Sequence, residues 1–199
     1  VHRSFLLTDH AGQNWTFYHI DFSFDDLRLG GSAFAQSLNK VGSDVPTCKN
    51  PEYFRDAFNA VQTLVNKGLV LAGHDISAGG LITTLLEMCF ANMEGGMEIS
   101  LDKFGHHDIV KILLAENPGV VVQIADKHKA EFKKIMDDAG VGYLKLGHPT
   151  DERLVQVTKD GAEYQFGIDY LRDVWYSTSY LLDRKQSMNG RAKARFENY

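Results

Sequence analysis

The stretch Leu69–Leu86 reads LVLAGHDISAGGLITTLL, and the fold expected for the rest of the chain is built around it. Its first five residues form an apolar run of the length of a buried strand, and its last six carry apolar side chains at helical spacing. Gly79 and Gly80 lie between these two parts, where a chain commonly turns. A strand that leads through His74-Asp75-x-Ser77 directly into a helix is therefore predicted.

Strands and helices are mixed without a strict repeat on both sides of this stretch. Short apolar or alternating runs predict strands, and apolar side chains three and four positions apart predict helices. Asp126 and Asp169 are placed to cap the last two helices. The predicted strands cover residues 4–8, 16–23, 69–73, 97–101, 120–124, 142–147, 153–158 and 163–167, and the predicted helices cover 33–39, 51–67, 81–90, 109–115, 127–139 and 170–182.

This order favours an α+β fold, with a mixed or antiparallel sheet and helices packed on one side, over a doubly wound parallel fold. A chain of 199 residues suits one large domain with an appended tail. We expect a domain at 1–183 and a polar, basic linker at 184–199. Because the sequence begins at Val1 without an initiator methionine and ends inside a polar segment, we expect an excised domain or a processed terminus.

The composition is that of an ordinary globular protein, with 44% hydrophobic and 24% charged residues. A formal net charge of −5 argues against general nucleic-acid binding, which needs a basic surface. No apolar run reaches the roughly 18 residues of a membrane span, so no membrane partner is expected. Cys48 and Cys89 are too few for a disulfide framework and lack metal-ligand spacing, which favours a reducing, cytoplasmic location.

The predicted strand–turn–helix carries the residue types that bind an anion together with its metal. Backbone N–H groups at a helix start favour phosphate oxygens, and Gly79 and Gly80 leave them unblocked. Ser77 adds a hydroxyl, Asp75 is a hard oxygen ligand of the kind Mg²⁺ prefers, and His74 is a candidate for polarising a substrate oxygen or moving a proton. The same pattern also fits a structural role, in which Asp and Ser cap the helix and the glycines allow close packing.

A second glycine-rich segment, Gly30-Gly31-Ser32, also precedes a predicted helix. It is a candidate for binding a phosphate or substrate, and it equally fits a main-chain turn. The other histidines, among them His19, have no second ligand at metal-binding spacing, so no metal role is predicted for them.

Four segments, in the same order, resemble those of the phosphoribosylformylglycinamidine synthase family. They are Arg28-Leu29-Gly30-Gly31-Ser32-Ala33, the stretch Leu69–Leu81, Ala115-Glu116-Asn117-Pro118-Gly119-Val120-Val121, and Trp175-Tyr176-Ser177-Thr178-Ser179-Tyr180 with Arg184. The resemblance covers nearly the whole chain, and four motifs in order are far more specific than one. By this resemblance the chain is similar to the second carboxy-terminal-type domain of the duplication that the long, single-chain form shares with aminoimidazole ribonucleotide synthetase, followed by a linker toward a glutaminase domain.

The resemblance implies a function and a set of ligands. The family's enzyme is an ATP-dependent carbon–nitrogen ligase of purine biosynthesis. It converts formylglycinamide ribonucleotide, ATP and glutamine to formylglycinamidine ribonucleotide, ADP, phosphate and glutamate. By match to the motif, Asp75 would coordinate Mg²⁺ and Ser77 would contact the nucleotide. The partners would be the ATP-binding half and the glutaminase domain of the same polypeptide, so the chain alone is expected to be inactive.

One position departs from the family pattern, because Ala78 stands where the family usually has Asp after the serine. This leaves open whether that position contributes to metal binding. A related ligase with the same domain is a further interpretation, but the segment around Trp175 and Arg184 has no place in the shorter relatives. A non-catalytic, structural or regulatory nucleotide-binding module and a plain interaction domain are the alternatives from other functional classes.

Overall fold

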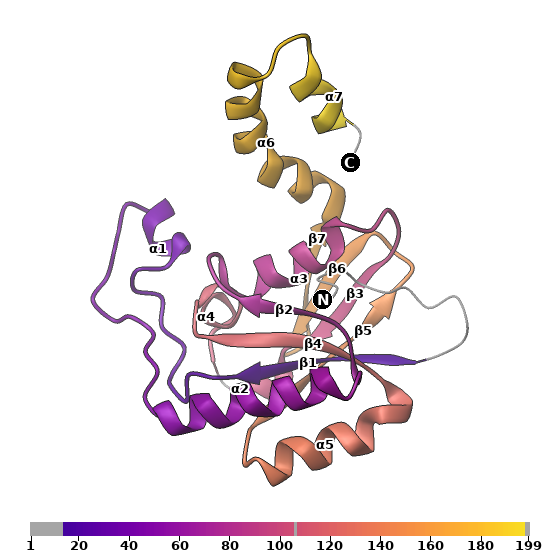
Figure 1. The fold of residues 1–199 in the computed structure, drawn as a ribbon. Coiled ribbons are helices and arrows are strands. Elements are labelled where there is room, and N and C mark those ends of the chain that lie inside the picture. Colours follow the sequence, from indigo (N-terminus) through magenta and orange to yellow (C-terminus); the bar gives the residue numbers. More distant parts are fainter. Residues whose placement is uncertain (1–13, 106, 198–199) are drawn as a thin grey trace.

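The computed structural model describes residues 14–105 and 107–197, and it contains one seven-stranded sheet flanked by helices (Figure 1). The strand order is β2-β4-β1-β5-β3-β6-β7. Within the described residues, β3 and β6 form the one parallel pair, and all other neighbours are antiparallel. The strands are β1 Trp15–Asp21, β2 Val70–Ile76, β3 Gly96–Ser100, β4 Gly119–Ala125, β5 Tyr143–Thr150, β6 Leu154–Lys159 and β7 Ala162–Gly167.

The helices cover both faces of the sheet (Figure 1). The short 3₁₀ turns are η1 Asp102–Phe104 and η2 Asp126–His128. The α-helices are α1 Ala33–Ser37, α2 Pro51–Asn66, α3 Gly80–Phe90, α4 Ile109–Leu114, α5 Lys129–Asp138, α6 Ile168–Gln186 and α7 Arg191–Glu197.

Two hydrophobic cores form because the central strands are apolar on both sides. In β4, Val121 packs into the core beneath α3 and α4, whereas its neighbour Val122 packs into the core beneath α2 and α5. Phe17 and Tyr18 of β1 divide in the same way. The predicted α+β class with a mixed sheet is confirmed. The expectation of helices on one side only is wrong, since strands buried on both faces require cover on both.

The two predicted aspartate caps are also wrong, because each carboxylate has a tertiary partner. Asp126 accepts a hydrogen bond from the Thr16 hydroxyl at 2.9 Å, and η2 precedes α5 without a side-chain cap. Asp169 lies inside the first turn of α6 and pairs with Arg153 at 3.0 Å. By contrast, the Asn50 side chain caps α2 by accepting from the N–H groups of residues 52 and 53, ahead of Pro51 at the first helical position.

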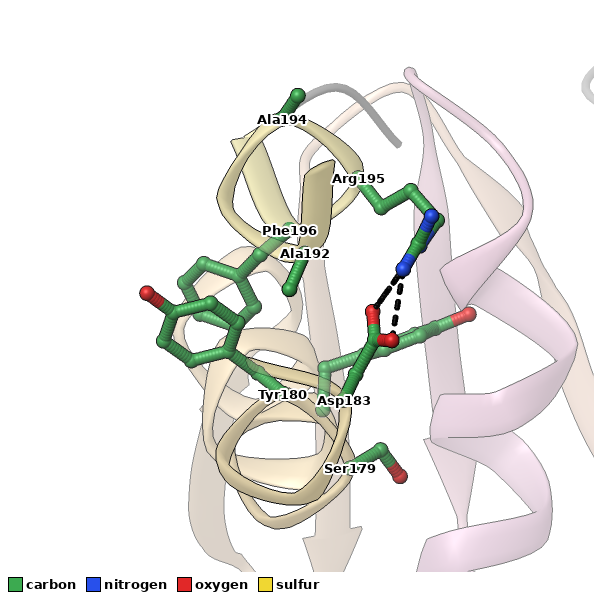
Figure 2. Close-up of a pocket in the computed structure, with 8 residues that line it drawn as sticks. Ser179, Tyr180, Asp183, Ala192, Ala194, Arg195 and Phe196 are labelled. Carbon is green, nitrogen blue, oxygen red and sulfur yellow. Dashed lines mark hydrogen bonds and ion pairs between the residues drawn. The ribbon is translucent and has the colours of Figure 1, made fainter. Parts of the chain in front are cut away.

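The last two helices form a hairpin that projects from the sheet (Figure 1). Tyr180 of α6 stacks on Phe196 of α7 with ring centroids 4.6 Å apart, and Arg195 pairs with both carboxylate oxygens of Asp183 (Figure 2). A cavity of about 660 Å³ lies between the two helices. The helix α6 passes the predicted boundary at 183, and the division into 1–183 and 184–199 stays a prediction.

The predicted strand at 4–8 lies outside the described residues. No helix in the described ranges is both long and apolar enough to cross a membrane.

Candidate functional site

The turn between β2 and α3 brings together most of the predicted site residues. The edge strand β2 does not end at Gly73, as predicted, but continues through His74 and Asp75, which pair with residues 121 and 120 of β4. Ser77 and Ala78 follow as exposed residues, and α3 begins at Gly80.

The two glycines of this turn have a structural reason to be glycine. Gly79 has φ +89° and Gly80 has φ +71°, a region that other residues rarely adopt. A Cβ atom on Gly80 would lie 2.7 Å from the carbonyl oxygen of Leu113 and 2.8 Å from the Cα of Leu114. The backbone of α3 therefore approaches α4 more closely than any side chain allows.

The N–H groups of both glycines have acceptors inside the chain. The Gly79 N–H donates to Oε1 of Glu116 at 2.8 Å, and the Gly80 N–H donates to the carbonyl oxygen of Ser77 at 3.0 Å. A phosphate at the start of α3 would compete with these bonds. The nucleotide contact assigned to Gly79 and Gly80 stays a prediction.

The side chain of Asp75 is 73% exposed, while that of His74 is largely covered. The Nδ1 atom of His74 lies 3.5 Å from the Asp75 carboxylate, and its Nε2 atom lies 3.2 Å from the carboxylate of Glu87 on α3. The Thr84 hydroxyl donates to the Asp75 carbonyl oxygen at 3.0 Å, which fixes the strand end against the helix. The Asp75 carboxylate is thus free to reach a ligand, and His74 is held between strand and helix.

Asp75 suits Mg²⁺ only as one ligand among several. Mg²⁺ in proteins commonly takes one or two carboxylates together with phosphate oxygens and water. Among the described residues, no group of three or more His, Cys, Asp or Glu is placed to hold a metal ion. The exposed carboxylate therefore fits a metal that is held mainly by a nucleotide or by another part of the protein.

The second glycine-rich segment, Gly30-Gly31-Ser32, lies beside this turn. The Gly30 and Gly31 N–H groups donate to carbonyl oxygens of the loop 41–44, at 2.9 and 2.7 Å. The Ser32 hydroxyl accepts from the Ala35 N–H as the cap of α1 and donates to the Leu29 carbonyl. These bonds give the segment a structural role, and its predicted phosphate or substrate contact stays a prediction.

Glu116 is the residue that sequence reasoning missed. Its Oε1 atom accepts from the Ala33 N–H and from the Gly79 N–H, each at 2.8 Å, and so joins the two glycine-rich segments. The sequence indicated Glu116 only as a member of the segment 115–121, which resembles a segment of the synthase family. Local patterns assign no partner to a carboxylate that lies between helix α4 and strand β4.

A polar cavity of about 400 Å³ lies at the carboxyl-terminal end of β1, and its lining includes the buried His19 and Asp21. Burial lowers the pKa of His19 to about 4, against a weaker opposing effect of Asp21. The Lys49 ammonium, hydrogen-bonded to Asp25, holds the pKa of that carboxyl well below its usual range.

The fold and the turn together describe an α+β domain with one exposed carboxylate beside a glycine turn. A family model described as AIR synthase related protein, C-terminal domain, matches residues 23–160. The chain therefore belongs to this family.

The chain is also similar to two curated synthases. It is 34% identical over 180 residues to the probable phosphoribosylformylglycinamidine synthase, chloroplastic/mitochondrial, of Arabidopsis thaliana, covering 89% of this chain and 13% of that protein. It is 37% identical over 164 residues to the phosphoribosylformylglycinamidine synthase of Homo sapiens, covering 80% of this chain and 12% of that protein. The chain thus spans about an eighth of these relatives.

Among solved structures, Thermotoga maritima PurL complexed with ATP superposes with a TM-score of 0.62 at 16% identity, covering 86% of this chain and 27% of that chain. At this identity the likeness establishes the fold alone.

Proposed function

We propose that this chain is one domain of a phosphoribosylformylglycinamidine synthase. The supporting observation is the similarity, at 34% and 37% identity, to two curated synthases across most of the chain. The proposed reaction uses ATP to activate the amide oxygen of formylglycinamide ribonucleotide. Ammonia released from glutamine then displaces phosphate to give the amidine, with ADP, phosphate and glutamate as the other products.

In this proposal the turn after β2 is a nucleotide contact. Asp75 supplies one carboxylate to the Mg²⁺ that accompanies ATP or ADP, and Ser77 contacts the nucleotide. Both are exposed at the turn, which supports a ligand that approaches from outside the domain. His74 is a candidate proton carrier, although its Nε2 atom faces Glu87 at 3.2 Å. Gly79 and Gly80 then shape the turn, since their N–H groups already have acceptors.

The Asp75→Ala variant of the full-length natural polypeptide tests this role. We expect its affinity for Mg·ADP to fall by about tenfold or more, because a charge-assisted contact contributes about 1.5–3 kcal/mol. Its thermal stability should change little, since the Asp75 side chain is 73% exposed. Asp138→Ala is the matched control, because that carboxylate is also exposed and pairs with Lys134 one helical turn away. Unchanged nucleotide content and unchanged turnover in the Asp75 variant would reject the assignment.

We further propose that the partners are other domains of the same polypeptide, including an ATP-binding half and a glutaminase domain. The chain's coverage of only 12–13% of the curated relatives supports this. So does α6, which leaves large apolar side chains exposed to solvent. These are Tyr170, Val174, Trp175, Leu181 and Leu182. A cytoplasmic location is part of the proposal, although the Arabidopsis relative is named chloroplastic/mitochondrial.

A non-catalytic nucleotide-binding module is the second candidate. It is favoured by the turn itself, where one exposed carboxylate is present and the glycine N–H groups are already bonded. The two functions differ in a measurable way. A structural nucleotide should copurify with the full-length protein and stay bound during turnover, whereas a catalytic one should exchange with added labelled ATP at the rate of the reaction.

A further inference from the structure

One carboxylate oxygen joins three segments that are far apart in the sequence. Glu116 Oε1 accepts from the Ala33 N–H, 83 positions away, and from the Gly79 N–H, 37 positions away, each at 2.8 Å. Ala33 is the first residue of α1, and Gly79 directly precedes α3. A single side chain therefore bonds to both the start of α1, after the Gly30–Ser32 segment, and the Ser77–Gly80 turn.

The next residue, Asn117, reinforces the same junction. Its Nδ2 atom donates to the Ser23 hydroxyl at 3.2 Å and to the Asp26 carbonyl at 3.1 Å. Its side chain is buried, and its Oδ1 atom accepts from the Arg28 N–H at 3.4 Å. Asn117 thus holds residues 23–28, and Glu116 links α1 to the turn before α3.

Glu116 also places a carboxylate beside the N-terminus of α3, where it accepts from the N–H of the N-cap residue, Gly79. The residue at the cap position is Gly79, which has no side chain to accept from the first helical N–H groups. A carboxylate near a helix N-terminus interacts favourably with the partial positive charge there. The acceptor for the Gly79 N–H thus comes from the segment between α4 and β4.

We propose that Glu116 is a positioning residue, which fixes the Ser77–Gly80 turn against α1 and so holds Asp75 and Ser77 in the arrangement that receives the nucleotide. The part that concerns the nucleotide rests on the proposed function, whereas the coupling of the two segments does not. A consequence follows for the ligand. Phosphate oxygens do not take the Gly79 N–H, which Glu116 occupies, and they reach the turn through the Asp75-bound cation and the Ser77 hydroxyl.

Hydrogen–deuterium exchange of the full-length natural polypeptide tests the coupling without any ligand. In Glu116→Ala, we expect peptides that contain Ala33 and Gly79 to exchange together, about tenfold faster or more, since both lose a charged acceptor. Glu116→Gln retains a carbonyl oxygen in the same place and should restore most of the protection. Glu163→Ala is the control, because the Glu163 side chain is exposed on β7 and accepts a hydrogen bond from the nearby Gln165 side chain. Unchanged exchange at both sites in Glu116→Ala would overturn the coupling, and so would a change confined to one of them.

Chemical rescue and nucleotide binding separate positioning from general stability. Added formate should slow the exchange of both peptides again in Glu116→Ala, because a small carboxylate fits the vacated position between two N–H groups. Formate should leave the thermal midpoint of the Glu163→Ala control unchanged.

Mg·ADP affinity should fall in Glu116→Ala and recover in Glu116→Gln. If Asp75→Ala weakens Mg·ADP binding and Glu116→Ala does not, the positioning of the ligand residues is wrong while the proposed function stands. If the wild-type protein binds no nucleotide, the proposed function fails, and the exchange experiment still decides the coupling.

Discussion

Replacing Gly80 with alanine should lower the free energy of unfolding, because the position has no room for a side chain. Gly80 has φ +71°, and a Cβ atom there would lie 2.7 Å from the Leu113 carbonyl oxygen and 2.8 Å from the Leu114 Cα. Both contacts are with main-chain atoms of α4 or its end, which cannot rotate away as a side chain can. The helix pair α3–α4 must therefore separate or the turn must change its conformation.

The magnitude follows from two contributions. An alanine in the left-handed region costs about 1–2 kcal/mol. Forcing a methyl group into a packed contact typically costs about 1–3 kcal/mol more. We therefore expect Gly80→Ala to lower the free energy of unfolding by about 2–5 kcal/mol, a large share of the total stability of a typical domain.

Gly140→Ala isolates the first contribution. Gly140 has φ +66°, but a Cβ atom there would meet no heavy atom within 4 Å. It should lose only the conformational part, about 1–2 kcal/mol. Denaturant unfolding of the wild type and both variants, followed by circular dichroism, gives the comparison. If Gly80→Ala costs no more than Gly140→Ala, the close approach of α3 to α4 is not what requires glycine, and a ligand role for Gly80 gains support.

Two further predictions concern buried polar groups. His19 has a pKa near 6.5 in the unfolded chain and about 4 in the folded chain, so the unfolded state binds more protons between these two pH values. The free energy of unfolding should therefore fall by up to about 3 kcal/mol as the pH drops through this window. His19→Gln should flatten that part of the stability–pH curve, measured by unfolding at pH 7, 5.5 and 4.5, and an unaltered slope would assign it to other groups. Arg153→Met should cost about 2–4 kcal/mol, because the guanidinium joins Asp169 to two main-chain carbonyls at 3.2 Å. The control Arg55→Met should cost less than about 0.5 kcal/mol, since Arg55 forms an exposed pair, and equal losses would contradict the role of Arg153.

Elements whose stability comes from their own apolar pattern could be predicted from the sequence. The strand predicted at 120–124 is β4 Gly119–Ala125, and the helix predicted at 51–67 is α2 Pro51–Asn66. Both carry continuous or helically spaced apolar residues that are buried in the structure. The pattern also contained the evidence for cover on both faces, because β4 is apolar at every position from 120 to 122.

Features that depend on a distant partner could not be predicted. A carboxylate before a helix caps it only if no stronger partner competes, and Asp126 and Asp169 bond instead to Thr16 and Arg153. The strand β2 likewise continues past Gly73, because β4 offers residues 121 and 120 as partners for His74 and Asp75. Glu116 is the clearest case, since its two acceptor contacts join positions 33 and 79.

The turn after β2 likewise combines groups that have partners within the chain and groups that are exposed to solvent. The hydrogen-bond donors at the start of α3 are satisfied, because the N–H groups of Gly79 and Gly80 have acceptors within the chain. The side chains of Asp75 and Ser77 are exposed to solvent, and Ala78 offers no second carboxylate. In the proposed nucleotide site, this turn would form one wall that is already ordered, and the metal and phosphates would find most of their ligands outside these residues. Nucleotide affinity should therefore appear only in a longer polypeptide, whereas the ordering of the turn by Glu116 should already be present in this domain.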